Sequence, residues 1–222
     1  MGVLKMKKKF LVSCTLIFVL TVVAYIIADR NIVETKNLHG GMMMSYDNYE
    51  ERLEGSDLVV IAKLAADPEN VLTPYGDGYP DGHHLSKIKI SDVIKGDENF
   101  AETEIEIREP YFTIDKGIAP GKDEIYYGDY TKMEQGNEYL LFLSWVEEWG
   151  QHGIASAHEG KFNLDGKDQA EQKVIQQNDK LRNLQMAIFS EEEIAKFKEL
   201  YLKDEESAPN RFCILFLDIF AL

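Results

Sequence analysis

An uninterrupted apolar segment, from Phe10 to Ala28, constrains this chain more than any other feature. It reads FLVSCTLIFVLTVVAYIIA and holds 19 residues without a charge, close to the roughly 20 residues that a helix needs to cross the hydrocarbon core of a bilayer. Residues 1–9 carry four lysines, and lysines favour the cytoplasmic side of a membrane. The sequence therefore predicts one transmembrane helix or signal anchor at the cell membrane, with the C-terminal domain extracytoplasmic.

Two other interpretations of this segment remain open. Val22 and Ala24 suit a signal peptidase site, and cleavage there would release a secreted protein. Residues 11–14 (LVSC) have the letters of a lipobox, in which case Cys14 would carry a lipid. The apolar run continues past Ala24 and lies mostly after Cys14, so an uncleaved anchor is the favoured interpretation.

Charge and cysteine content limit the partners and the covalent structure of the remaining chain. Residues 37–222 hold 18 basic and 37 acidic residues, a formal charge of −19. Such an acidic surface repels nucleic acid, so no nucleic-acid partner is expected. Cys14 and Cys213 are the two cysteines of the sequence, and they cannot meet if one lies in the membrane, so we predict no intramolecular disulfide.

Strand patterns dominate the chain after residue 57. Apolar runs or alternating patterns typical of β-strands occupy residues 58–64, 88–94, 105–107, 139–146, 149–157 and 161–164. The second of these has a one-residue slip near Ser91 and Asp92, which predicts a β-bulge. Residues 67–84, rich in proline and glycine, and residues 111–130, rich in tyrosine and acid, are expected to form long loops.

Helical patterns flank this β region. Residues 45–55 predict a short helix with Ser45 as its N-cap, and Ser190 with Glu193 forms a capping box before a longer amphipathic helix. The apolar end of the chain, residues 212–222, is either a further core element or an unpaired tail. The expected organisation is a cytoplasmic end, a transmembrane helix, a linker, a β-barrel domain and a helical C-terminal extension, over residues 1–9, 10–28, 29–44, 45–166 and 167–222.

The order of these strand and turn motifs resembles a known family. It runs from residues 56–63 (SDLVVIAK) through 93–97 (VIKGD) and 136–143 (GNEYLLFL) to 160–162 (GKF). This order resembles that of uncharacterised exported or membrane-anchored proteins of Gram-positive bacteria. The resemblance implies a mainly β (α+β) fold, an OB-like five-stranded barrel with a C-terminal helix. The inhibitory domain of tissue inhibitors of metalloproteinases shares this barrel shape, but its mechanism needs a free N-terminal cysteine, and no cysteine lies between Cys14 and Cys213.

A metal site is one candidate function. His83 and His84 lie close in sequence to Asp77 and Asp81, and imidazole with carboxylate could bind zinc or another transition metal. Spacing provides no third ligand, and the closing glutamate of an EF-hand is missing. The expectation is therefore no metal and no cofactor, with an exported metal-binding protein or enzyme built on residues 77–84 as the alternative.

Aromatic residues supply the second candidate. Four tyrosines of the predicted second loop could form a surface that binds carbohydrate or protein: Tyr111, Tyr126, Tyr127 and Tyr130. Trp145 and Trp149 are aromatic candidates of the same kind, although core packing explains Trp145 better. Ser144 lacks the setting of a hydrolase nucleophile, and phosphate-binding glycine motifs are absent from the sequence. We therefore expect a membrane-anchored binding module that is not an enzyme, with a structural component of the cell envelope as a further alternative.

Overall fold

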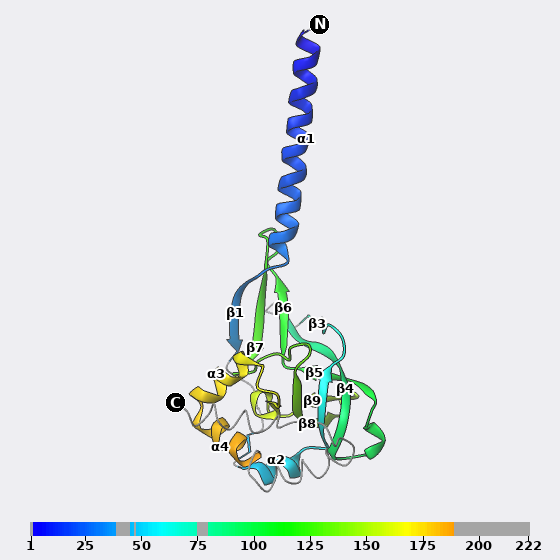
Figure 1. Ribbon diagram of the computed structural model, residues 1–222, viewed down its shortest axis with the longest axis vertical. Helices are drawn as coiled ribbons and strands as arrows, with labels where there is room; N and C mark the ends of the chain where they lie inside the picture. The colour runs from blue at the N-terminus through cyan, green and yellow to red at the C-terminus, as the bar shows by residue number, and fades with distance from the viewer. Residues whose placement is uncertain (1, 39–44, 47, 75–79, 189–222) are drawn as a thin grey trace, which may run out of the picture. The chain divides into compact units, whose positions relative to one another are not determined.

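The computed structural model describes residues 2–38, 45–46, 48–74 and 80–188 (Figure 1). The chain divides into two compact units. The N-terminal unit consists of Met1–Asn37 with Thr113–Ile125, and the barrel unit consists of Leu38–Phe112 with Tyr126–Leu222. Each unit is described by itself.

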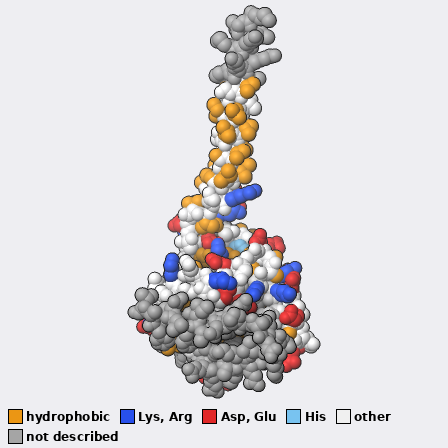
Figure 2. Space-filling model, viewed as in Figure 1, with side chains coloured by type: hydrophobic (Ala, Val, Ile, Leu, Met, Phe, Trp, Pro, Cys, Tyr) orange, Lys and Arg blue, Asp and Glu red, His pale blue; other side chains and the backbone are white. Residues whose placement is uncertain are grey.

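The N-terminal unit is built on helix α1, Gly2–Asp29. Within it, Val12–Asp29 has a mean hydropathy of 2.2, and none of this stretch is buried inside the protein. Figure 2 shows apolar side chains along the exposed helix. By length and composition α1 can cross a membrane, and a signal sequence would have the same properties.

A three-stranded sheet follows, in the order β1-β7-β6. Its strands are β1 (Ile32–Leu38), β6 (Tyr111–Asp115) and β7 (Lys122–Tyr127). Two predictions were therefore wrong, because β1 lies where a linker was expected and β6 and β7 lie where a long loop was expected. The side chains of β1 are mostly exposed, so the strand is held by backbone pairing and carries no apolar pattern. Pro110 immediately precedes β6, a position where its missing N–H is tolerated.

The barrel unit contains a closed five-stranded barrel of OB-like topology. Its strands pair in the order β2-β4-β5-β9-β8, and β8 pairs with β2 to close it. The pair β5–β9 is parallel, and the other four are antiparallel. The strand bounds are Leu58–Leu64 (β2), Asp81–Lys95 (β4), Glu104–Glu109 (β5), Glu138–Val146 (β8) and Gln151–Ile154 (β9). The predicted fold class is confirmed.

Strands β2 and β8 carry the core because both of their faces are buried. Val60 pairs with Leu141 and belongs to the cluster inside the barrel, whereas Ile61 pairs with Leu140 and belongs to a second cluster with residues of α3 and α4. All four side chains have no exposed surface. This double burial explains why both strands read as continuous apolar runs without alternation.

Two features of β4 concern its pairing partners. The register between β2 and β4 shifts at two places, one of them between Ile61 and Ala62, which pair with Asp92 and Ile90. The bulge predicted at Ser91–Asp92 is thereby confirmed. The expected loop over residues 67–84 was wrong in part, because β3 (Glu69–Thr73) pairs antiparallel with the first half of β4. The side chains of β3 are mostly exposed, so this strand has no continuous apolar run.

Short helices and one further strand complete the barrel unit. Helix α2 (Tyr49–Gly55) begins at Asn48, whose side chain accepts a hydrogen bond from the Glu51 amide, so the expected N-cap at Ser45 was wrong. The remaining elements are the 3-10 helices η1 (Glu98–Phe100) and η2 (Ala157–Gly160), strand β10 (Lys161–Asn163), which pairs with β8, and helices α3 (Gln169–Gln177) and α4 (Asp179–Ile188). The capping box at residue 190, Cys213 and the apolar tail 212–222 lie outside the described residues.

Candidate functional site

The outer face of β4 and β5 carries a cluster of polar and aromatic side chains beside the β8–β9 turn. The Arg108 cluster, as we call it, comprises Arg108, His83, Trp149, Asp81 and Tyr127. Strand alternation creates it, because Ile107 and Glu109 are fully buried on one side of β5 while Arg108 is partly exposed on the other. The cluster thus combines residues of the neighbouring strands β4 and β5, the last residue of β7 and a turn that lies far away in sequence.

Arg108 stands at the centre of the cluster. Its guanidinium carbon lies 3.7 Å from the ring centroid of Trp149, well within the range of a cation–π contact. On another side, its Nη2 atom lies 2.6 Å from Nδ1 of His83. The Nε atom of Arg108 is buried and has no hydrogen-bond partner among the described residues, so this donor has unused capacity.

Trp149 is held in place by the turn that carries it. Its amide donates to the Val146 carbonyl at 3.0 Å, and the Gly150 amide donates to the same oxygen at 2.9 Å. A Cβ atom at Gly153 on β9 would lie 3.2 Å from the indole ring, so glycine leaves room for the ring to lie close to the strand. Even so, 45% of the Trp149 surface remains exposed, which leaves part of a large aromatic side chain for a partner.

Protonation states within the Arg108 cluster follow from burial and from the arginine charge. Burial, with a further contribution from Arg108, lowers the pKa of His83 to about 4, so the ring is neutral at pH 7 and its Nδ1 can accept from Arg108. Burial also lowers the pKa of Arg108, and Asp81 opposes that shift. The Tyr127 hydroxyl donates to the Asp81 carboxylate, and burial followed by this bond raises the pKa of Tyr127 to about 12.

The two adjacent histidines do not form a metal site together. His84 is buried on the opposite side of β4 from His83. Its ring stacks on Tyr111 with centroids 4.0 Å apart, and its Nδ1 lies 2.9 Å from the Tyr111 carbonyl oxygen. Within the described residues there is no group of three His, Cys, Asp or Glu that could hold a metal ion, and Asp77 lies outside them.

The expected tyrosine surface needs correction. Tyr111, Tyr126 and Tyr130 are only 4%, 8% and 3% exposed. They stack on one another through Tyr111, with ring centroids 5.4 and 6.3 Å apart. The hydrophobic effect outweighs the cost of burying their hydroxyls where these find partners, so three of the four tyrosines fill the core. Tyr127 alone among the four is partly exposed, and it belongs to the Arg108 cluster.

Trp145 was expected in the core, and this prediction was also wrong. It is 47% exposed. The buried residues of β8 end at Leu143, and the strand continues beyond the barrel core to Trp145. Its ring packs edge-on against His152, with centroids 5.1 Å apart, and its indole nitrogen donates to Glu147 at 2.7 Å. Trp145 therefore occupies the end of the barrel, whereas Trp149 lies against Arg108.

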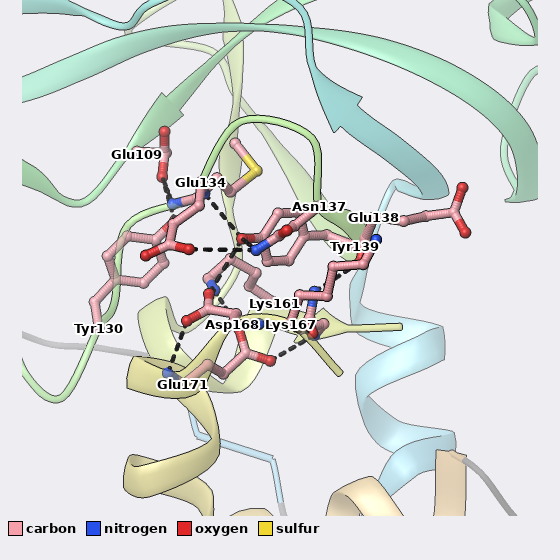
Figure 3. A network of polar contacts seen from close by, with 12 residues as sticks. Glu109, Tyr130, Glu134, Asn137, Glu138, Tyr139, Lys161, Lys167, Asp168 and Glu171 are labelled. Carbon is pink, nitrogen blue, oxygen red and sulfur yellow. Dashed lines mark hydrogen bonds and ion pairs between the residues drawn. The ribbon is translucent and has the colours of Figure 1, made fainter. Parts of the chain in front are cut away.

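A buried ionic network lies elsewhere in the barrel unit (Figure 3). Lys161 is 2% exposed and contacts the carboxylates of Asp168 and Glu171. Its ammonium also lies 4.5 Å from the ring centroid of Tyr139. Glu171 accepts from the Asn163 amide as well, so the network ties β10 to helix α3. Its donors and acceptors satisfy one another, which favours a structural role.

Glu109 forms the other end of this network. Its carboxylate is fully buried and accepts from Ser86, from the Tyr130 hydroxyl at 2.6 Å and from the Met133 amide at 2.9 Å. Burial raises the pKa of Glu109 despite these bonds. The small cavity beside Lys161 and Glu171 has a volume of about 10 Å³, room for about one water molecule. A substrate could not reach these groups, so we assign no catalytic role to them.

A second buried pair joins α2 to η2. Arg52 is completely buried and bonds to Glu159, which is 5% exposed. Lys180 of α4 lies 3.1 Å from the same carboxylate. Burial lowers the pKa of Arg52 to about 10, and Glu159 opposes the shift. Because Arg52 and Lys180 come from different helices, their shared carboxylate fixes α2 and α4 to the barrel.

The sequence matches no known family model and no curated protein. The similarity to OB-like proteins therefore rests on the barrel topology and is a similarity of fold. Sequence reasoning assigned no role to Arg108, and it grouped Trp149 with the aromatic residues that could stack on a ligand without placing it in a site. Arg108 follows the alternating segment 105–107, and Trp149 was expected to begin a strand over residues 149–157 but lies in the turn before β9. Their pairing depends on the parallel contact between β5 and β9.

Proposed function

We propose that the chain is a non-enzymatic binding module, anchored by α1 in a bacterial cell membrane with its barrel outside the cytoplasm, and that the Arg108 cluster is its ligand site. The observation that carries this proposal is the exposed stack of Trp149 on Arg108. The four lysines before the apolar segment support this orientation, because lysines favour the cytoplasmic side of a membrane.

The position of the cluster on the barrel supports ligand binding. In OB folds, ligands bind on the face of the second and third strands, next to the loops that follow the first and fourth strands. Here β4 and β5 are the second and third barrel strands, and the β8–β9 turn with Trp149 follows the fourth. The Arg108 cluster therefore occupies the face that this fold uses for oligonucleotides and oligosaccharides.

The chemistry of the cluster favours a carbohydrate. An exposed indole offers a flat apolar surface for a sugar ring, and Arg108 with Asp81 offers a donor and an acceptor for hydroxyl groups. Residues 37–222 carry a formal charge of −19, which disfavours polyanionic nucleic acid. We therefore name oligosaccharides of the cell surface as the ligand class.

The test uses the full-length protein in lipid nanodiscs and defined probes: peptidoglycan glycan fragments with and without stem peptides, and chitooligosaccharides. Isothermal titration calorimetry measures affinity for wild type, Trp149→Ala and the matched control Trp145→Ala. Trp149 and Trp145 are 45% and 47% exposed and lie on the same β8–β9 hairpin, but only Trp149 lies against Arg108, whereas Trp145 packs on His152.

We expect one of these probes to bind and Trp149→Ala to weaken it about 30-fold, since removal of a central tryptophan costs about 2 kcal/mol or more. Trp145→Ala should bind like wild type. Absence of binding to every glycan probe, or equal losses in the two variants, would overturn the proposal.

A structural envelope component is the second candidate. It is favoured by the fully paired buried network of Lys161, which stabilises the barrel without offering a site. This candidate predicts that Arg108→Ala and Trp149→Ala leave every measured interaction of the protein unchanged.

A further inference from the structure

The β6–β7 turn of the N-terminal unit lies against the last turn of α1. The Tyr25 hydroxyl donates to the Ile118 carbonyl at 3.1 Å, and the Gly121 amide donates to the Asp29 carboxylate at 3.3 Å. One residue further, the Lys122 amide donates to the Asn31 carbonyl at 2.9 Å. Three contacts in succession therefore hold this turn alongside the end of the helix, within one compact unit.

The composition of the turn is unusual for a solvent-exposed hairpin tip. It reads KGIAPGK over residues 116–122, so an apolar tip of Ile118, Ala119 and Pro120 is flanked on both sides by a glycine and a lysine. Ile118 is 96% exposed. No side chain of the described chain covers it, although large apolar side chains are normally at least partly buried.

The depth of the contact follows from helix geometry. The apolar stretch Val12–Asp29 has 18 residues, which corresponds to about 27 Å of helix. Tyr25 lies four residues before Asp29, so its Cα is about 6 Å further into the membrane than the charged end of the span. That depth is the boundary between headgroups and acyl chains, where tyrosine is enriched, and Tyr25 contacts the Ile118 backbone there.

The flanking lysines suit the same position. Lys116 lies 3.1 Å from Asp123, and Lys122 lies 3.3 Å from Asp115. The acidic partners precede and follow the turn in sequence, so both ion pairs lie at its base and not at the apolar tip. Long lysine side chains can keep their charge among lipid headgroups while an apolar segment beside them enters the acyl region.

We infer that the Ile118–Pro120 tip inserts into the outer leaflet of the membrane beside α1, as a second lipid contact of this chain. The partner that covers the exposed apolar tip is thus the lipid bilayer, the same bilayer that α1 spans next to it. This inference rests on the membrane anchoring contained in the proposed function, and it goes beyond it by giving the N-terminal unit a second point of attachment.

The experiment measures lipid contact at single sites of the full-length protein in vesicles of phosphatidylcholine and phosphatidylglycerol. In a Cys14→Ser, Cys213→Ser background, Ile118→Cys is labelled with an environment-sensitive nitrobenzoxadiazole probe, and quenching by brominated lipids is recorded. Asp115→Cys is the matched control, because it lies three residues earlier on the same hairpin, about 10 Å along the strand, and its side chain is 73% exposed. A variant that keeps only Cys14 reports on the helix.

We expect the probe at residue 118 to be quenched several-fold more strongly than the probe at residue 115. Equal quenching at the two hairpin sites, together with strong quenching at Cys14, would overturn the insertion of the tip and leave the anchor intact. Failure of quenching at all three sites would overturn the anchor as well. Because Ile118 is almost fully exposed, its replacement leaves packing unchanged and the variant should fold.

Discussion

The guanidinium carbon of Arg108 lies 3.7 Å from the ring centroid of Trp149, although 41 residues separate them in sequence. The parallel pair β5–β9 creates this neighbourhood, because Arg108 pairs with Gly153 and the Trp149 ring covers that glycine. The contact therefore reports on closure of the barrel as well as on the candidate ligand site.

Gly153→Ala tests this arrangement. The added methyl group would lie 3.2 Å from the indole ring, so the ring must shift by a few tenths of an ångström against Arg108. We expect glycan affinity to fall, by less than in Trp149→Ala because the indole is retained, and the unfolding free energy of this buried position to fall by about 1 kcal/mol, the typical effect of a single substitution. Calorimetry and urea unfolding measure the two quantities. Wild-type affinity in Gly153→Ala would show that the position of Trp149 does not matter for the ligand.

His83 should remain neutral down to about pH 4, because burial and then the Arg108 charge lower its pKa. Because the pKa is lower in the folded chain, the contribution of neutral His83 to the unfolding free energy is complete above the ordinary pKa of 6.5. It is lost as the pH falls towards 4. Two-dimensional NMR of the imidazole signals measures the titration directly. In Arg108→Met the pKa should rise towards 6.5, and a wild-type value already near 6.5 would contradict the assigned contact.

The contribution of Glu109 to the unfolding free energy should depend on pH in the opposite direction to that of His83. Burial raises its pKa above the ordinary value of 4.5, so the stability that it contributes is complete below about pH 4.5 and is lost as the pH rises through the folded-state pKa. The Glu109→Gln variant can keep the same partners, because the amide group of the new side chain can donate to Ser86 and its oxygen can accept from Tyr130 and Met133.

The measurement is the unfolding free energy of wild type and Glu109→Gln between about pH 4 and pH 7, a range that begins below the ordinary pKa of 4.5 and extends in the direction of the shift. The difference, wild type minus variant, should become more negative as the pH rises. A difference that stays constant over this range would show that Glu109 has the same pKa in the folded and unfolded chains.

Replacement of Lys161 should cause a large loss of stability. Removing one partner of a buried ion pair leaves uncompensated charge, which costs about 3–5 kcal/mol, so Lys161→Met should lower the unfolding free energy by that amount in urea. The control is Lys167→Met, whose side chain is 67% exposed beside Asp165 and whose loss should cost less than about 1 kcal/mol. Adding Glu171→Gln to Lys161→Met should restore part of the stability. Equal effects of the two single lysine variants would refute the role of the network.

The amino-acid sequence alone determined the elements whose burial is visible as a local pattern. The apolar stretch that ends at Ala28 predicted α1, and the continuous runs 58–64 and 139–146 predicted β2 and β8, because strands buried on both faces need apolar residues at every position. The slip at Ser91 likewise predicted the bulge of β4. These signals are local, so a single sequence suffices to read them.

The tertiary structure alone decided the strands without an apolar pattern and the composition of the candidate site. β1 and β3 expose most of their side chains and form because a neighbouring strand pairs with their backbone. The sequence pattern placed Tyr111 in a loop, but the folded chain buries it. The pattern placed Trp145 in the core, but β8 extends beyond the end of the barrel and exposes it. Arg108 and Trp149 meet only through the β5–β9 pairing, and such contacts depend on chain topology, which no local pattern encodes.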